Sequence, residues 1–126
     1  MSESGSLVTI IDDDDAVRDS LRLLVESSGR AAQDYASGEL FLNSDIAQAG
    51  CLLLDLHMPG ISGLELLRLL RGRGWGVPVI VISGRRDAML DAEAREAGAS
   101  AILSKPFDDE LLLDLVEKAL QGRALA

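Results

Sequence analysis

Residues 51–55 read CLLLD: four apolar residues, Cys51 to Leu54, that stop at a carboxylate, Asp55. A short strand that is apolar on both faces is typical of a parallel sheet with helices packed against both sides. Three similar apolar runs lie at residues 7–11, 77–82 and 101–103. Each run is followed by a longer segment with the spacing of an amphipathic helix. The sequence therefore predicts a repeated strand–helix unit.

The expected helices cover residues 15–28, 62–70, 87–97 and 108–120, and a further helix is capped by Ser37 and carries Leu40, Phe41 and Ile46. A weaker strand at 31–35 completes five strand–helix units. The 126 residues form one domain, too short for a β/α barrel of about 250 residues. We therefore predict an α/β fold with a five-stranded parallel doubly wound sheet, flavodoxin-like in strand order 2-1-3-4-5, and five helices. The single domain spans 1–126, with its core at about 6–120, and no effector domain is expected.

The composition excludes several classes of protein. The formal net charge is -9, from 21 acidic and 12 basic residues, which argues against direct binding of nucleic acid or an anionic membrane. A single cysteine, Cys51, cannot form an internal disulfide. Residues 1–6 lack the features of a signal peptide, and no apolar run approaches the roughly 20 residues that span a bilayer. We expect a cytoplasmic protein without a membrane partner.

Reactive polar side chains follow four of the predicted strands. Asp12 and Asp13 follow the first strand, Asp55 the third, Ser83 the fourth and Lys105 the fifth. The carboxyl ends of the strands in such a sheet meet at one edge, where ligands bind. We therefore expect these side chains to share one crevice. An acidic run such as 12–15 also suits a helix N-terminus, and we assign Asp14 and Asp15 to helix capping or to a role around the metal ligands.

Three crowded carboxylates favour a hard divalent cation, because they otherwise raise one another's pKa. We expect Mg²⁺, or Mn²⁺, to be bound by Asp13 and Asp55, with Asp12 holding a water and the backbone carbonyl of His57 as a further ligand. An ionised aspartate is also a nucleophile toward phosphorus. Lys105 and Ser83 would then contact the phosphoryl oxygens. The residues indicate an aspartyl-phosphate site, with Asp55 as the phosphoacceptor.

The motifs at these positions resemble a known family. Asp12-Asp13, the stretch 55–63 (DLHMPGISG), the stretch 81–84 (VISG) and Lys105-Pro106-Phe107 are similar to the receiver domain of bacterial two-component response regulators. The stretches 17–21, 37–42 and 62–67 resemble most the subgroup that precedes a LuxR-type DNA-binding domain, as in FixJ-type regulators. The resemblance covers roughly residues 7–120.

This resemblance implies that a sensor histidine kinase transfers a phosphoryl group to Asp55, with slow autodephosphorylation afterwards. It implies a switch through Ser83 that reshapes the face made by the fourth helix, fifth strand and fifth helix. The output would be transcription, if the chain is part of a longer protein.

The sequence departs from the family at one switch position, where Ile102 replaces an aromatic residue. A rotating aromatic side chain therefore cannot report phosphorylation in this protein. Two alternatives are open: Ile102 repacks, or the change is transmitted through Ser83 and the following loop alone. Gly84, Arg85 and Ile102 are the expected switch and rim residues, and the side chains of His57 and Arg85 are expected to tune the phosphate lifetime. An apolar patch of Ile102, Leu113 and Leu120 suggests a phosphorylation-dependent homodimer.

The sequence argues against two other functions of this site. A phosphatase with an aspartate nucleophile would carry a second aspartate two residues after Asp55, where this chain has His57. A pseudo-receiver, which binds a partner without phosphorylation, would have lost Asp55, Lys105 or the acidic pair. All of them are present, so the phospho-accepting switch is preferred.

Overall fold

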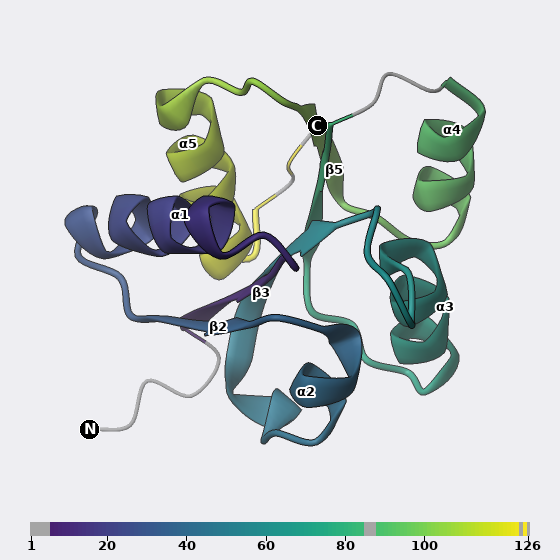
Figure 1. Cartoon of the computed structure of the whole chain (residues 1–126). Coiled ribbons are helices and arrows are strands. Elements are labelled where there is room, and N and C mark those ends of the chain that lie inside the picture. The colour runs from purple at the N-terminus through teal and green to yellow at the C-terminus, as the bar shows by residue number, and fades with distance from the viewer. Residues whose placement is uncertain (1–5, 85–87, 124, 126) are drawn as a thin grey trace.

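The computed structural model describes residues 6–84, 88–123 and 125 of the chain. Strands and helices alternate through this part of the sequence (Figure 1). The strands are β1 (Leu7–Ile11), β2 (Ala32–Tyr35), β3 (Ala49–Asp55), β4 (Val79–Ser83) and β5 (Ala101–Ser104). The helices are α1 (Asp15–Ser27), α2 (Gly38–Leu42), α3 (Gly63–Gly72), α4 (Ala88–Glu96), α5 (Asp109–Leu120) and a short 3-10 helix, η1 (Ile46–Gln48).

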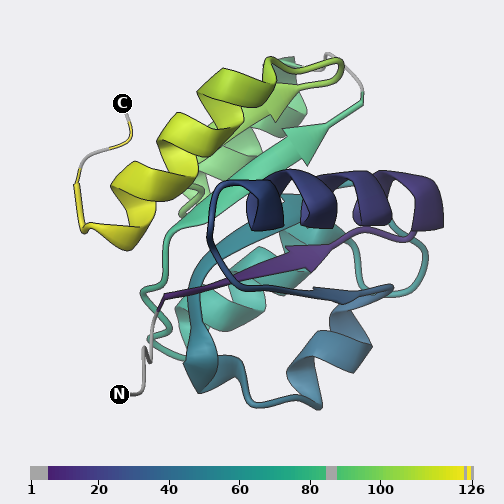
Figure 2. The ribbon, with the colours of Figure 1, turned by 90° about the vertical axis from the view of Figure 1, so that its left-hand side faces the viewer.

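The strands form one parallel sheet in the order β2-β1-β3-β4-β5. Helices α1 and α5 cover one face of the sheet, and α2, α3 and α4 cover the other (Figure 1). Figure 2 looks onto the face that carries α1 and α5. The predicted fold class and strand order are confirmed.

Strand β3 lies in the middle of the sheet, between β1 and β4, and its side chains enter both cores. Cys51 and Leu53 pack in the cluster formed with α1 and α5, whereas Leu52 and Leu54 pack in the cluster formed with α2, α3 and α4. Successive side chains of a strand point to opposite faces, so a strand buried on both sides must be apolar at every position. This explains the unbroken apolar run that ends at Asp55.

Side-chain caps set the beginnings of several helices. Asp14 accepts hydrogen bonds from the backbone of Ala16 and Val17, which confirms its predicted capping role. Ser37 caps α2 as predicted, and Ser62 forms a capping box with Glu65 at α3.

The helix after Ser37 is shorter than predicted. It ends at Leu42, with Asn43 as its C-cap, and Ile46 lies in the separate helix η1. The hydroxyl of Ser44 donates to the carbonyl of Phe41, a local bond that competes with helix continuation. Ile46 still packs against the core, as its spacing in the sequence predicts, although it lies in η1 and not in the helix after Ser37.

The strand predicted from Val77 begins at Val79. Pro78 has no N–H to donate to the sheet, although its carbonyl accepts from Leu52 N at 3.0 Å. On α3 the fully buried leucines are Leu66, Leu67 and Leu70, whereas Leu64, expected on this face, is half-buried. Within the described residues, no helix combines the length and apolarity that a membrane span requires.

Candidate functional site

The polar residues at the strand ends come together at the carboxyl edge of the sheet. A cavity of about 370 Å³ opens there, lined by Asp12, Asp13, Asp14, Asp55, His57, Gly84 and Lys105. Ser83 ends β4 directly beneath this edge and is buried, with 1% of its surface exposed. Asp12, Asp13, Asp55 and Lys105 therefore line one pocket, as expected, whereas Ser83 is buried next to Gly84 and is not among the residues that line it.

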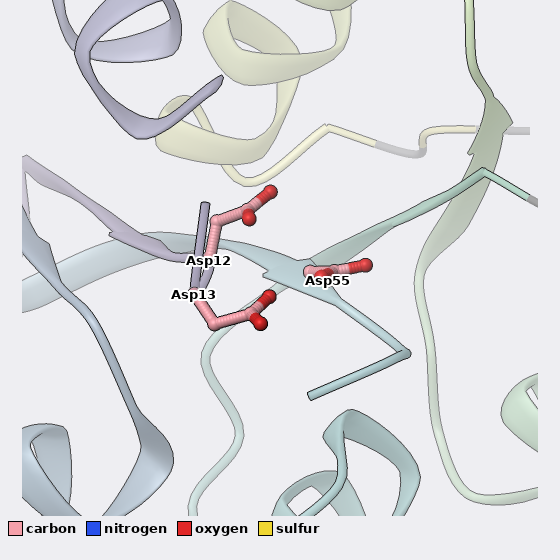
Figure 3. A group of neighbouring side chains, drawn as sticks. All are labelled: Asp12, Asp13 and Asp55. Carbon is pink, nitrogen blue, oxygen red and sulfur yellow. The ribbon is translucent and has the colours of Figure 1, made fainter. Parts of the chain in front are cut away.

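Three carboxylates form the acidic part of this pocket. Oxygens of Asp12, Asp13 and Asp55 lie within 4.8 Å of one another, where β1 and β3 end (Figure 3). Asp12 and Asp55 are buried, at 2% and 7% exposed, whereas Asp13 is exposed. Grouped oxygen donors of this kind fit a hard divalent cation such as Mg²⁺ and do not suit a thiophilic metal.

The environment of Asp55 penalises its charged form. Burial, followed by repulsion from Asp12, raises the pKa of Asp55 from 3.8 to about 6. The backbone N–H of His57, which donates to Asp55 Oδ1 at 3.3 Å, and the charge of Lys105 act in the opposite direction. A cation placed among the carboxylates would remove this penalty.

Lys105 approaches the pocket from the segment after β5. Its Nζ lies 3.5 Å from Asp12 Oδ2, and its side chain is 28% exposed. Its backbone N–H donates to the carbonyl of Ser83 at 2.8 Å, which fixes the lysine relative to the end of β4. The ammonium group therefore pairs with Asp12 here.

Sequence reasoning missed two residues that shape the pocket. Gly63, the first residue of α3, is buried so close to β3 that a Cβ atom would collide with the carbonyl oxygen of Asp55 and lie 2.7 Å from the Cα of Leu56. Arg18, on α1, donates from Nη1 to the carbonyl oxygen of Asp12 at 2.9 Å. The glycine after Ser62 was visible as part of a motif, but the contact of Arg18 depends on how α1 lies against β1.

The predicted rim residues have different positions. His57 and Gly84 line the acidic pocket, and Arg85 lies outside the described residues. Ile102 does not line this pocket, because it packs half-buried against the core shared by α3 and α4.

The apolar patch near Ile102 is composed of other residues than expected. A groove of about 220 Å³ runs over β5 between α4 and α5, and Leu111, Leu115 and Leu125 line it together with Ile102. The prediction of Leu113 and Leu120 in this patch is wrong. Leu120 packs against the α1–α5 core, and Leu113 is half-buried outside the groove. Position 111 faces the groove because it lies one turn before Leu115 on α5.

The fold and this acidic pocket define the class of the protein. The sequence model described as the response regulator receiver domain matches residues 8–117, and the chain belongs to this family.

Its relatives include the transcriptional regulatory protein FixJ of Azorhizobium caulinodans, which is 48% identical over 118 residues, covering 93% of this chain and 56% of that protein. The response regulator protein TodT of Pseudomonas putida is 40% identical over 122 residues, covering 96% of this chain and 54% of that protein. The chain spans about half the length of these curated relatives. The expected kinship with FixJ-type receivers is confirmed.

Solved structures agree with this assignment. The crystal structure of FixJ-N superposes with a TM-score of 0.85 at 37% identity, covering 96% of each chain. The structure of the response regulator StyR gives a TM-score of 0.84 at 39% identity, covering 94% of this chain and 60% of that one.

Proposed function

We propose that this chain is a phospho-accepting switch, in which Asp55 takes a phosphoryl group from the phosphohistidine of a sensor histidine kinase. The observation that carries the proposal is the arrangement of Asp12, Asp13 and Asp55 around one pocket that Lys105 also enters. Asp13, Asp55 and the backbone carbonyl of His57 would hold Mg²⁺ or Mn²⁺, and Asp12 would bind it through a water.

In the transfer step, a carboxylate oxygen of Asp55 attacks phosphorus in line with the leaving histidine. The new O–P bond forms as the P–N bond breaks, and the imidazole nitrogen keeps the electron pair and takes a proton from water. Lys105 exchanges its contact with Asp12 for a phosphoryl oxygen, and the Ser83 hydroxyl donates to another. A divalent cation held by these carboxylates would neutralise part of the charge on the phosphoryl oxygens.

A second cavity supports docking of the kinase next to this pocket. It measures about 410 Å³, lies between α1 and the segment after β5, and shares Lys105 with the acidic pocket. Val17, Leu21, Leu24 and Phe107 give it an apolar wall. A kinase helix seated in this cavity would lie beside the acidic pocket, because Lys105 lines both.

The test is intact-mass spectrometry after incubation with acetyl phosphate and Mg²⁺, with Asp55→Asn as the control. We expect one added phosphoryl group, which is lost in the variant and when the metal is chelated. An unmodified mass at short times, with a donor preparation that labels a known receiver, would contradict the proposal and favour the pseudo-receiver alternative, which the comparisons do not support.

The rim side chains set the lifetime of the phosphoaspartate by controlling the access of water. His57 lines the pocket two residues after the acceptor, and Arg85 follows Ser83 by two residues. We expect His57→Ala or Arg85→Ala to change the rate of dephosphorylation, measured by the decay of the phosphorylated mass. Unchanged decay in both variants would remove this part of the proposal.

Phosphorylation of Asp55 is transmitted by Ser83 and by a repacking of Ile102 to the α4–β5–α5 face. This face then binds a second copy of the chain. In a longer protein the dimer would control transcription, the activity for which the relative FixJ is named. Light scattering with and without a phosphoryl mimic tests this step. A monomeric mass under both conditions would exclude the dimer.

A further inference from the structure

Arg18 connects three segments of the chain behind the acidic pocket. Its Nη1 donates to the carbonyl oxygen of Asp12 at 2.9 Å, its Nη2 donates to Asp15 Oδ1 at 2.6 Å, and its Nε lies 3.9 Å from Asp34 Oδ2. The side chain is only 15% exposed, although it stands on a surface helix. One guanidinium therefore contacts the turn after β1, the first turn of α1, and β2.

The contact with Asp12 completes a set of bonds that immobilise this residue. The backbone N–H of Asp12 donates to the carbonyl of Tyr35 at 3.2 Å, and its Oδ1 accepts from the backbone of Asp14 at 2.9 Å. With Arg18 on its carbonyl oxygen, Asp12 is held at its amide, its side chain and its carbonyl. The structure thus constrains the whole turn between β1 and α1.

The carbonyl of Asp12 belongs to the peptide plane whose nitrogen is that of Asp13. A fixed plane determines where the Cα of Asp13 lies and the direction in which its side chain leaves. Within the described part of the chain, the exposed carboxylate of Asp13 has no hydrogen bond or ion pair of its own. The orientation of the Asp13 side chain toward Asp55 therefore depends on the backbone segment that Arg18 holds.

We propose that Arg18 is a positioning residue, which orients the Asp12–Asp13 peptide so that the carboxylates bind the divalent cation. The inference rests on the metal site of the proposed function. Asp15 and Asp34, which do not line the acidic pocket, offset the charge of the guanidinium. Arg18 therefore keeps its hydrogen bond to Asp12 while repelling a bound cation less.

The two possible influences of Arg18 on the cation, orientation of its ligands and repulsion by the positive charge, predict opposite changes in cation affinity when Arg18 is replaced. Removing a positive charge beside a cation site should tighten cation binding, because the Coulomb repulsion is lost. Removing a group that orients the ligands should weaken it, typically by 10-fold to about 100-fold for residues behind metal ligands. Arg18→Gln removes both charge and orientation, whereas Arg18→Lys keeps the charge and loses the planar fork.

Arg22 supplies a matched control on the same helix. Its Nη1 lies 3.6 Å from Asp34 Oδ2, a carboxylate that Arg18 also approaches. Among the described residues, the ion-pair partners of Arg22 are Asp34 and Glu26, and Asp12 is not one of them. Arg22→Gln therefore removes a nearby charge and leaves the Asp12–Asp13 turn untouched.

The experiment measures binding of Mn²⁺ to the full chain by the electron paramagnetic resonance signal of the free ion. We expect Arg18→Gln and Arg18→Lys to raise the dissociation constant by about 10-fold, while Arg22→Gln leaves it unchanged or slightly lower. Partial unfolding of a variant would lower the number of sites per chain without changing their affinity, so the two effects separate in the same titration.

A second readout follows the rate of acetyl phosphate labelling as the concentration of Mg²⁺ is raised. Positioning predicts a higher half-saturating concentration of Mg²⁺ for both Arg18 variants and a maximal rate close to that of the wild type. The inference would be overturned if Arg18→Gln bound the cation as tightly as the wild type or more tightly. It would also be overturned if Arg18→Lys had wild-type affinity for the cation. Absence of Mn²⁺ binding by the wild type would instead overturn the metal site itself, and the inference with it.

Discussion

Replacing Asp55 by asparagine should stabilise the metal-free protein at neutral pH. Burial and the neighbouring Asp12 raise the pKa of Asp55 from 3.8 to about 6, so the folded protein holds this proton more tightly than the unfolded chain does. That difference corresponds to about 3 kcal/mol of penalty on the folded state once the carboxyl is ionised. Asparagine has the same shape and keeps an oxygen that accepts from the N–H of His57.

The sign of the pH dependence follows from the raised pKa. Because the folded state binds more protons between pH 3.8 and about 6, wild-type stability falls as the pH rises through this window. Above the window the full penalty is present, and below it the penalty is absent. The advantage of Asp55→Asn should therefore be about 3 kcal/mol above pH 7 and should disappear below about pH 4.

The assay is urea unfolding of both proteins in chelator, followed by circular dichroism at several pH values, with the slope of the transition compared. Asp19→Asn is the control, because Asp19 is exposed on α1 and its replacement should change the free energy of unfolding by less than about 0.5 kcal/mol. Equal stability of the wild type and Asp55→Asn above pH 7, or a gain that does not vary with pH, would refute the reasoning.

Three further predictions concern the backbone, the loops and the metal. Gly63→Ala should lower the free energy of unfolding by about 1–3 kcal/mol and slow labelling by acetyl phosphate, because its Cβ would displace the backbone of Asp55. The control is Gly76→Ala, which should leave the labelling rate unchanged because the added carbon has no atom within 4 Å beyond the neighbouring residues. Arg71→Met should lower the free energy of unfolding in urea by about 2–4 kcal/mol, because the guanidinium donates to the carbonyls of Trp75, Val77 and Gly98. The control is Arg68→Met, which loses one exposed ion pair of 3.4 Å and should lower the free energy of unfolding by less than about 1 kcal/mol. Mg²⁺ at about 100 times its dissociation constant should raise the free energy of unfolding by about 2.7 kcal/mol, and a chelator should reverse this gain; a melting temperature that does not respond to Mg²⁺ would count against the metal site.

The gathering of the site residues was predictable because it follows from topology. Asp12, Asp55, Ser83 and Lys105 each stand where an apolar run stops, and parallel strands bring all such positions to one edge. Sequence reasoning therefore needed only the positions of the strand ends, and errors of one or two residues in their bounds did not matter.

Features that depend on the rotation of a helix or on the path of a terminus were not predictable. The patch beside Ile102 contains Leu111 in place of Leu113, because a turn of α5 presents one of them to the groove and the other away from it. Leu125 joins the same groove from beyond α5, after the chain turns at Gly122 with φ +71. Apolar spacing identifies a helix and its buried stripe, but it does not say which neighbour covers the flanks.

The position of Trp75 has a consequence for spectroscopy. The chain contains one tryptophan, and it lies between α3 and β4, where its ring meets Phe41 edge-on at 5.9 Å and its carbonyl accepts from Arg71 at 2.8 Å. Trp75 therefore lies at the edge of the sheet where the strands begin, opposite the edge that carries the carboxylates after β1 and β3. The natural fluorophore of the protein is thus placed to report loss of the fold, and a ligand arriving at the carboxyl edge should leave its emission almost unchanged. A fluorescent readout of the site requires a second tryptophan introduced beside the acidic pocket.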